Sequence, residues 1–190
     1  SEADESLRQI SGIDSDTFEK TSTAIRTRGF WLGTNLLTAL IAASVINIFK
    51  ETLEQVIFLA VLMPIIASMG GVAATQTLTI TVRGLALGQI VRANYLYIFN
   101  RELMVGISNG FIWAVILSLI ACSWFQDWLL AWVICLSMII NLVAGVLSGM
   151  GIPILLKGLK MDPAVAGSVI VTTVTDVIGF FSFLGLATYF

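Results

Sequence analysis

One acidic residue, Asp176, lies in the middle of a long apolar stretch, and two hydroxyl residues precede it at helical spacing. The stretch runs from Pro163 to Phe190, with Asp176 13 residues after its start and 14 before its end. In a helix, Ser168, Thr172 and Asp176 share one face because they are four residues apart. A carboxylate at mid-membrane costs on the order of 3 kcal/mol, so an ion, a proton or a partner usually compensates it. We therefore interpret Asp176 first as a functional residue, on a polar face that Ser168 and Thr172 share.

A structural interpretation competes with the functional one. Ser and Thr side chains can bond back to carbonyls of their own helix, and a buried Asp can join a neighbouring helix by a hydrogen bond. Both interpretations stay open for Ser168 and Thr172. For Asp176 the cost of burying a charge favours function.

An earlier apolar segment contains residues that weaken a helix. Pro64 lacks a backbone donor, and Gly70 and Gly71 follow it among small and hydroxyl residues. Carbonyls freed at such a break suit a hard cation where they line a watery cavity. Alone, the pattern favours a kink packed closely on another helix. Together with Asp176, it makes Gly70 and Gly71 candidate metal ligands.

The composition indicates an integral membrane protein, because 57% of the residues are hydrophobic and 12% are charged. Crossing a bilayer takes roughly 20 apolar helical residues. Five segments qualify: 30–49, 56–82, 103–125, 128–156 and 163–190. We therefore expect an all-α domain of five transmembrane helices over 30–190. A cytoplasmic polar arm or linker helix at 1–29 precedes it, and 83–102 is expected to be an interfacial helix.

The basic residues predict the orientation of these spans. Of the ten Lys and Arg residues, nine fall on one side of the alternating spans and Lys50 alone on the other. Positive charge gathers on the cytoplasmic side of membrane proteins. We expect a multi-pass protein of the cell (inner) membrane, with a cytoplasmic N-terminus and an extracytoplasmic C-terminus.

The sequence offers little for catalysis. It has no histidine, no second carboxylate expected inside the membrane, no Gly-x-Ser-x-Gly elbow and no phosphate-binding loop of the Walker type. Cys122 and Cys135 lack the CxxC spacing of a zinc site. The sequence has no block of basic residues of the kind that binds nucleic acid. Gly106 with Gly110, and Gly145 with Gly149, have the spacing of close helix packing. We expect no enzyme.

Several motifs together resemble the MgtE-type magnesium channels and transporters, which have relatives among eukaryotic magnesium solute carriers. The motifs are Met63-Pro64, Gly70-Gly71, Thr75-Gln76, Val82-Arg83-Gly84-Leu85-Ala86-Leu87-Gly88, Arg101-Glu102, Asp162-Pro163-Ala164 and Thr172-Thr173-x-x-Asp176 before Gly179. They follow the family's order through nearly the whole membrane portion. The chain departs from the family's Gly-Gly-Asn-x-Gly-x-Gln at Val72 and Ala74.

The resemblance implies a homodimer with a pore on its two-fold axis, lined by the second and fifth helices. It implies that Asp176 of both subunits holds a hydrated Mg²⁺, with Thr172, Ser168, Gly70 and Gly71 contributing oxygens. Mg²⁺ keeps several of its waters, which suits a wide site of this kind. Family members also carry cytoplasmic regulatory domains, which are possible partners outside this chain.

The leading hypothesis is a divalent cation channel or transporter that carries Mg²⁺ into the cell down its electrochemical gradient. Mn²⁺ and Co²⁺ are the other candidate ions. One alternative is a carrier coupled to H⁺ or Na⁺. Another is a membrane scaffold subunit without transport, in which Asp176 pairs with a helix of a different protein.

Overall fold

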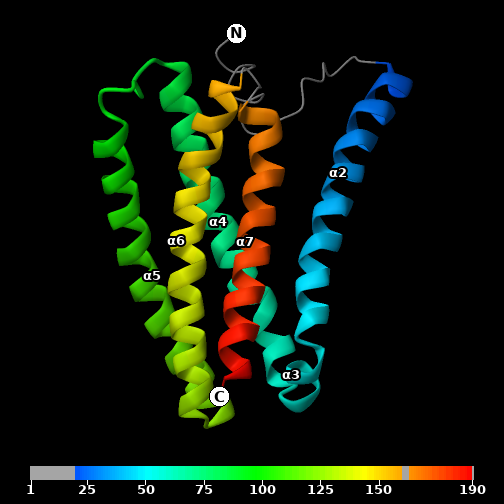
Figure 1. Cartoon of the computed structure of the whole chain (residues 1–190), viewed down its shortest axis with the longest axis vertical. Coiled ribbons are helices and arrows are strands. Elements are labelled where there is room, and N and C mark those ends of the chain that lie inside the picture. Colours follow the sequence, from blue (N-terminus) through cyan, green and yellow to red (C-terminus); the bar gives the residue numbers. More distant parts are fainter. Residues whose placement is uncertain (1–19, 160–162, 190) are drawn as a thin grey trace.

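The chain is a bundle of long helices that lie roughly side by side and run alternately up and down (Figure 1). The computed structural model describes residues 20–159 and 163–189, with backbone alone at 163–166. The helices are α2 (Thr21–Ile48), α3 (Lys50–Gln55), α4 (Phe58–Ala86), α5 (Tyr95–Phe125), α6 (Trp128–Gly158) and α7 (Pro163–Thr188). The described residues contain no strand, as the all-α prediction requires.

Five of these helices are long and apolar enough to cross a membrane: α2, α4, α5, α6 and α7. The prediction of five membrane helices is confirmed, although α2 and α5 begin earlier than expected. Residues 1–19 of the predicted arm lie outside the described residues, as does Asp162, while residues 21–29 form the first turns of α2.

The predicted interfacial helix at 83–102 is not a separate element. Helix α4 continues to Ala86, and α5 already begins at Tyr95. Gly88, at φ +67°, adopts the left-handed conformation that ends many helices. The backbone N–H groups of Gln89 and Ile90 then turn back to the Gly84 carbonyl, at 2.8 and 3.0 Å. The amphipathic appearance of 83–102 therefore reflects two helix ends and a turn.

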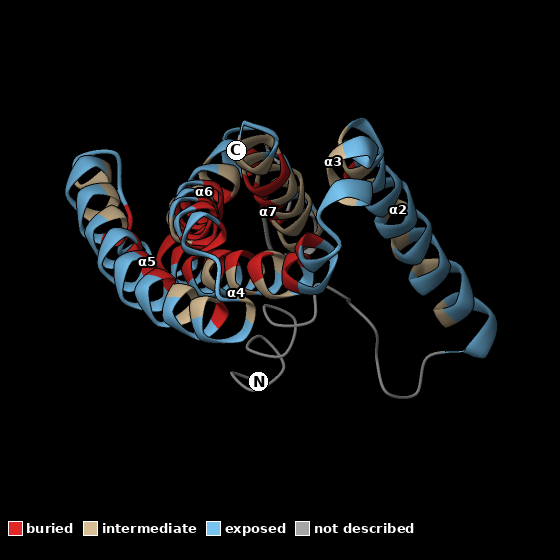
Figure 2. Cartoon of the chain, turned by 90° about the horizontal axis from the view of Figure 1, so that it is seen from below, coloured by how far each residue is buried: buried red, intermediate tan, exposed pale blue. Residues whose placement is uncertain are grey.

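Helix α6 lies at the centre and packs against α4, α5 and α7 (Figure 2). Glycines allow the close approach. A Cβ on Gly145 would lie 2.7 Å from the Gly70 carbonyl oxygen, and one on Gly149 would lie 2.5 Å from that of Ala74. Gly106 and Gly110 of α5 also face α6: a Cβ on Gly106 would lie 2.7 Å from the Val146 side chain, whereas one on Gly110 would lie at an ordinary 3.6 Å from Leu142. The packing role predicted for both glycine pairs is confirmed.

The core has two apolar clusters with polar residues between them. One cluster includes Ile66 of α4, Ile134 and Met138 of α6, and Phe183 of α7; the other joins Ala74, Leu78 and Val82 of α4 to Val171 of α7. In sequence, Gly70 lies between the α4 parts of the two clusters, and Thr175 and Gly179 lie between their α7 parts. The predicted site thus falls at the junction of the two clusters.

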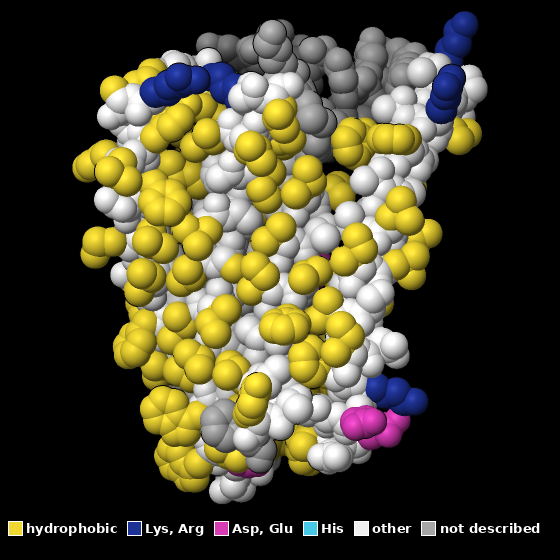
Figure 3. Space-filling view, in the orientation of Figure 1, with side chains coloured by type: hydrophobic (Ala, Val, Ile, Leu, Met, Phe, Trp, Pro, Cys, Tyr) yellow, Lys and Arg dark blue, Asp and Glu magenta, His cyan; other side chains and the backbone are white. Residues whose placement is uncertain are grey.

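The outer helices leave much apolar surface uncovered. Helix α2 leans away from the bundle and meets α7, so that Ala42 is its one buried residue. Hydrophobic side chains cover the middle of the face in Figure 3, whereas Lys and Arg appear toward its ends. This surface suits contact with lipid or with another membrane-embedded chain.

Candidate ion-binding site between α4 and α7

Asp176 lies near the midpoint of α7 and is partly buried. Two residues close to it in the helix, Thr175 and Gly179, form a buried face. Thr175 is fully buried, and Gly179 is buried against α6, with its ideal Cβ position 2.8 Å from Asn141 Nδ2. Asp176 thus lies beside the buried face of α7 that Thr175 and Gly179 form.

Asn141 of α6 lies between α4 and α7 at this level. Its side chain is fully buried, and Nδ2 donates a 2.7 Å hydrogen bond to the Ile66 carbonyl of α4. The amide fills the space that side chains at Gly70 and Gly179 would occupy. Gly70 of α4 and Gly179 of α7 therefore leave the room that this α6 amide needs.

An open groove of about 680 Å³ follows α4 beside α7, and we call it the α4–α7 groove. Its lining consists of Ser68, Gly71, Val72, Thr75, Gln76, Thr79 and Ile80 from α4 and Thr172 from α7. Two of the predicted site residues, Gly71 and Thr172, line this groove. The other three, Gly70, Ser168 and Asp176, are not among its lining residues. The hydroxyl and amide groups of the groove are oxygen donors of the type that hard cations and their waters accept.

The hydroxyls of α7 bond back to their own helix. Thr172 Oγ1 donates to the Ser168 carbonyl at 2.9 Å, and Thr173 Oγ1 donates to the Val169 carbonyl at 2.6 Å. Ser168 is partly buried and lies one turn before Thr172. The hydroxyl hydrogen of Thr172 is thus used within α7, as the structural interpretation expects. The hydroxyl oxygen can still accept a hydrogen bond from the groove.

The two glycines of α4 differ in position. Helix α4 runs through Pro64 and both glycines without interruption, so the break that would free carbonyls is absent there. Gly70 faces α6, and its carbonyl packs against Gly145. The Gly71 carbonyl instead accepts from Thr75 Oγ1 at 2.8 Å, beside the groove. Gly70 thus packs against α6, and its role as a metal ligand stays a prediction.

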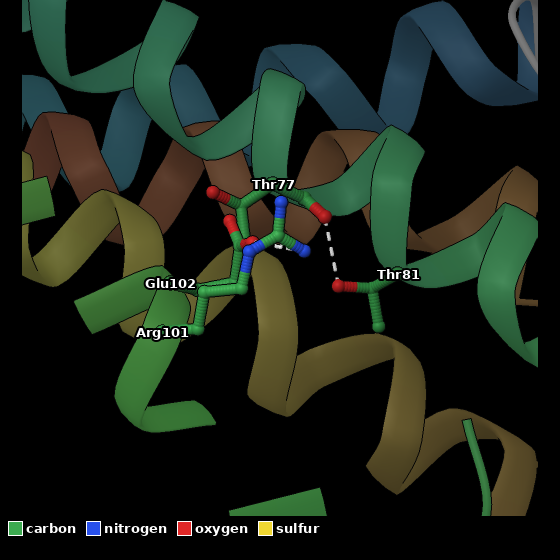
Figure 4. Close-up of polar contacts among 4 residues, drawn as sticks. All are labelled: Thr77, Thr81, Arg101 and Glu102. Atoms are coloured by element: carbon green, nitrogen blue, oxygen red, sulfur yellow. Dashed lines mark hydrogen bonds and ion pairs between the residues drawn. The ribbon is translucent and has the colours of Figure 1, made fainter. Parts of the chain in front are cut away.

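Two polar residues were missed as functional candidates. Asn141 lies in a predicted membrane segment without a site role, and Glu102 is the last residue of the predicted interfacial stretch. Glu102 is 4% exposed on α5, so a second buried carboxylate exists within a predicted membrane helix. Its position four residues before Gly106, at the start of the small-residue face, was the available signal. Glu102 lies next to Thr77 in Figure 4.

Residues 63–186, which contain both glycines of α4 and Asp176, match the family model of MgtE, described as a divalent cation transporter. The chain belongs to the MgtE family. With its five apolar helices, MgtE membership makes this a multi-pass membrane protein of a transporter family. Within the part of the chain that the structure describes, no three Asp, Glu, His or Cys side chains group to hold a metal.

Three curated relatives carry the description Magnesium transporter MgtE. The one from Bacillus subtilis is 34% identical over 100% of this chain and 42% of its own length. That from Enterococcus faecalis is 28% identical over 95% of this chain and 40% of its own length. That from Thermus thermophilus is 29% identical over 83% of this chain and 35% of its own length. The chain therefore spans less than half the length of these MgtE relatives.

Proposed function

We propose that this chain conducts Mg²⁺ through the membrane, with Asp176 as the charged ligand of the path. The observation that carries the proposal is Asp176 itself, partly buried near the middle of a membrane helix. Thr172, one turn away, lines a groove with Gly71. Relatives described as magnesium transporters support the choice of Mg²⁺. Mn²⁺ and Co²⁺ are the competing ions to be measured.

A homodimer with the path on its two-fold axis completes the site in this proposal. One chain supplies one carboxylate at this level, and its groove is open along one side. Two copies facing each other would supply two negative charges, which one divalent ion neutralises. Because Mg²⁺ releases water reluctantly, we propose that it is held through its hydration shell. Thr172 and Ser168 then contact its waters, with the Gly71 carbonyl as a further acceptor.

The proposed direction is into the cytoplasm. The described Arg residues gather at the ends where α2 and α5 begin and α4 ends, whereas Lys50 lies at the opposite end. By the positive-inside rule, the first of these ends is cytoplasmic. An ion of charge two gains about 4.6 kcal/mol across 100 mV, so no nucleotide is required. Cytoplasmic regulatory domains remain proposed partners, as the resemblance implies.

Ion flux into liposomes tests the function. The reconstituted chain should take up Mg²⁺ when a membrane potential is applied and no H⁺ or Na⁺ gradient exists. Uptake that requires either gradient would instead identify the coupled carrier. A folded, dimeric protein with no flux under any gradient would identify the scaffold subunit. Competition by Mn²⁺, Co²⁺ and Ca²⁺ in the same assay ranks the ions.

A further inference from the structure

A second cavity, with a largely apolar wall that contains four polar residues, lies between α4 and α5, and we call it the Glu102 cavity. Its volume is about 350 Å³. It shares Val72, Gln76 and Ile80 of α4 with the α4–α7 groove, but α5 and α6 complete its wall where α7 bounds the groove. The two hollows are therefore distinct and meet along one edge of α4.

Glu102 is the charged residue of this cavity. Its side chain is 6% exposed, and the cation recorded beside it is Arg101, whose Nη1 lies 3.9 Å from Oε1. That separation is too long for a hydrogen bond. Arg101 is also 64% exposed, so it offers its charge mainly to the outside. A buried carboxylate with such weak compensation is costly unless something else binds it.

Three neutral polar side chains share the cavity with the carboxylate. Thr77 lies next to Glu102 in Figure 4, and Gln76 and Asn109 line the same cavity. The backbone carbonyl of Thr77 already accepts from Thr81 Oγ1 at 2.7 Å, whereas its hydroxyl remains on the cavity side. Asn109 Nδ2 donates to the Val105 carbonyl at 3.1 Å, which leaves the acceptor oxygen of its amide for other contacts.

We propose that the Glu102 cavity binds a hydrated divalent cation, separately from the path at Asp176. One carboxylate with hydroxyl and amide oxygens is a suitable outer surface for Mg²⁺, which is commonly held through one or two carboxylates and several waters. Room is sufficient, because a water takes roughly 30 Å³ in the liquid, and the cavity of about 350 Å³ therefore holds an ion with its first shell.

The position of Glu102 makes the site accessible. Glu102 lies seven residues after Tyr95, the first residue of α5, and so about 10 Å along the helix from that end. An ion can reach it from the water at the end that carries Arg92 and Arg101, without crossing the membrane. The proposed ion would occupy the site at rest and brace α5 against α4.

Trp113 provides a local probe, because it lines the Glu102 cavity. Tb³⁺ takes oxygen ligands and emits when a nearby tryptophan is excited. We expect the full 190-residue chain in detergent to sensitise bound Tb³⁺, and Mg²⁺ to displace it. Trp113→Phe should remove this Mg²⁺-sensitive emission. Trp132→Phe is the matched control, because Trp132 lines a different pocket with Trp128.

Ligand variants locate the charge. Glu102→Gln should weaken Tb³⁺ binding at this site. The Tb³⁺ concentration that gives half of the Mg²⁺-sensitive emission should rise at least about tenfold. Asn109→Ala, at an exposed position on the cavity wall, should weaken Tb³⁺ binding in the same direction and serves if the first variant does not fold. Glu54→Gln removes an exposed carboxylate elsewhere and should change nothing.

Emission that persists in Trp113→Phe, resists Mg²⁺, or is unchanged in both ligand variants would overturn the Glu102 site. Such a result leaves transport through Asp176 standing, because flux is measured separately. Conversely, a chain without flux that keeps the Trp113 signal refutes the transport proposal and supports this one.

Discussion

Asn141 of α6 donates a 2.7 Å hydrogen bond to the carbonyl oxygen of Ile66, 75 residues earlier in the chain. The bond spans two helices at the level where Gly70 and Gly179 face the same amide. Asn141 Oδ1 is buried and has no hydrogen-bond partner within the described residues. A single amide of α6 therefore bonds to α4 and packs against Gly179 of α7, the two helices that border the proposed ion path.

The contact between Asn141 and Gly179 predicts a compensating pair of substitutions. Gly179→Ala would place a Cβ 2.8 Å from Asn141 Nδ2, and such overpacking costs about 1–3 kcal/mol. Asn141→Ala should also destabilise, because it removes a buried hydrogen bond. The double variant should be more stable than the sum of the two effects predicts. Thermal unfolding in detergent measures all three, with Gly185→Ala on α7 as control.

Additive losses would contradict this account of Asn141. Gly185 is the matched position because its Cβ would meet Phe49 at an ordinary 3.7 Å. If Gly185→Ala lost as much stability as Gly179→Ala, the loss in Gly179→Ala would not be due to a clash with the Asn141 amide.

The approach of α6 to α4 predicts that Gly145→Ala is harmful. Its Cβ would lie 2.7 Å from the Gly70 carbonyl oxygen, and backbone cannot move aside as a side chain does. We expect a lower melting temperature and reduced Mg²⁺ uptake. Gly151→Ala, on the same helix with nothing within 4 Å, should be neutral or slightly stabilising. Equal melting temperatures for the two variants would argue against the packing described for α4 and α6.

Val72 predicts a change in ion recognition. It is 52% exposed and borders both the groove and the Glu102 cavity. Val72→Asn adds an amide oxygen that can accept from a hydrated ion, and one such hydrogen bond is worth about 1 kcal/mol. The Mg²⁺ concentration for half-maximal uptake should fall about fivefold, and competition by Ca²⁺ should weaken. Val72→Leu controls for size, and the same shift in that variant would exclude the amide as its cause.

Much of the fold follows from the sequence alone. Long apolar runs identify the five membrane helices, because bilayer thickness fixes the length that each must have. The spacing of Gly145 and Gly149 predicts a close helix contact for the same reason that a Cβ would not fit there. The boundary between α4 and α5 was missed, because it depends on the left-handed Gly88 and the turn onto Gly84.

The site could be predicted only in part. Apolar context alone identifies Asp176, and helical spacing adds Thr172. Gly70 and Gly71 are neighbours in sequence but face different partners, which depends on how α4 packs on α6. The burial of Glu102 likewise requires the contact of α5 with α4 and α6, since a polar Asn-Arg-Glu sequence reads as a helix end at the membrane surface. Tertiary packing decides such cases.

Mg²⁺ uptake by Asp176 variants in liposomes tests the central claim most directly. Asp176→Asn keeps the size of the side chain and removes its charge, whereas Asp176→Glu keeps the charge. We predict that Asp176→Asn and Asp176→Ala lower the initial rate at least about tenfold, equivalent to about 1.4 kcal/mol. Both should still assemble like the parent chain, and Asp176→Glu should retain more uptake than either. Full uptake by correctly assembled Asp176→Asn and Asp176→Ala would contradict the account.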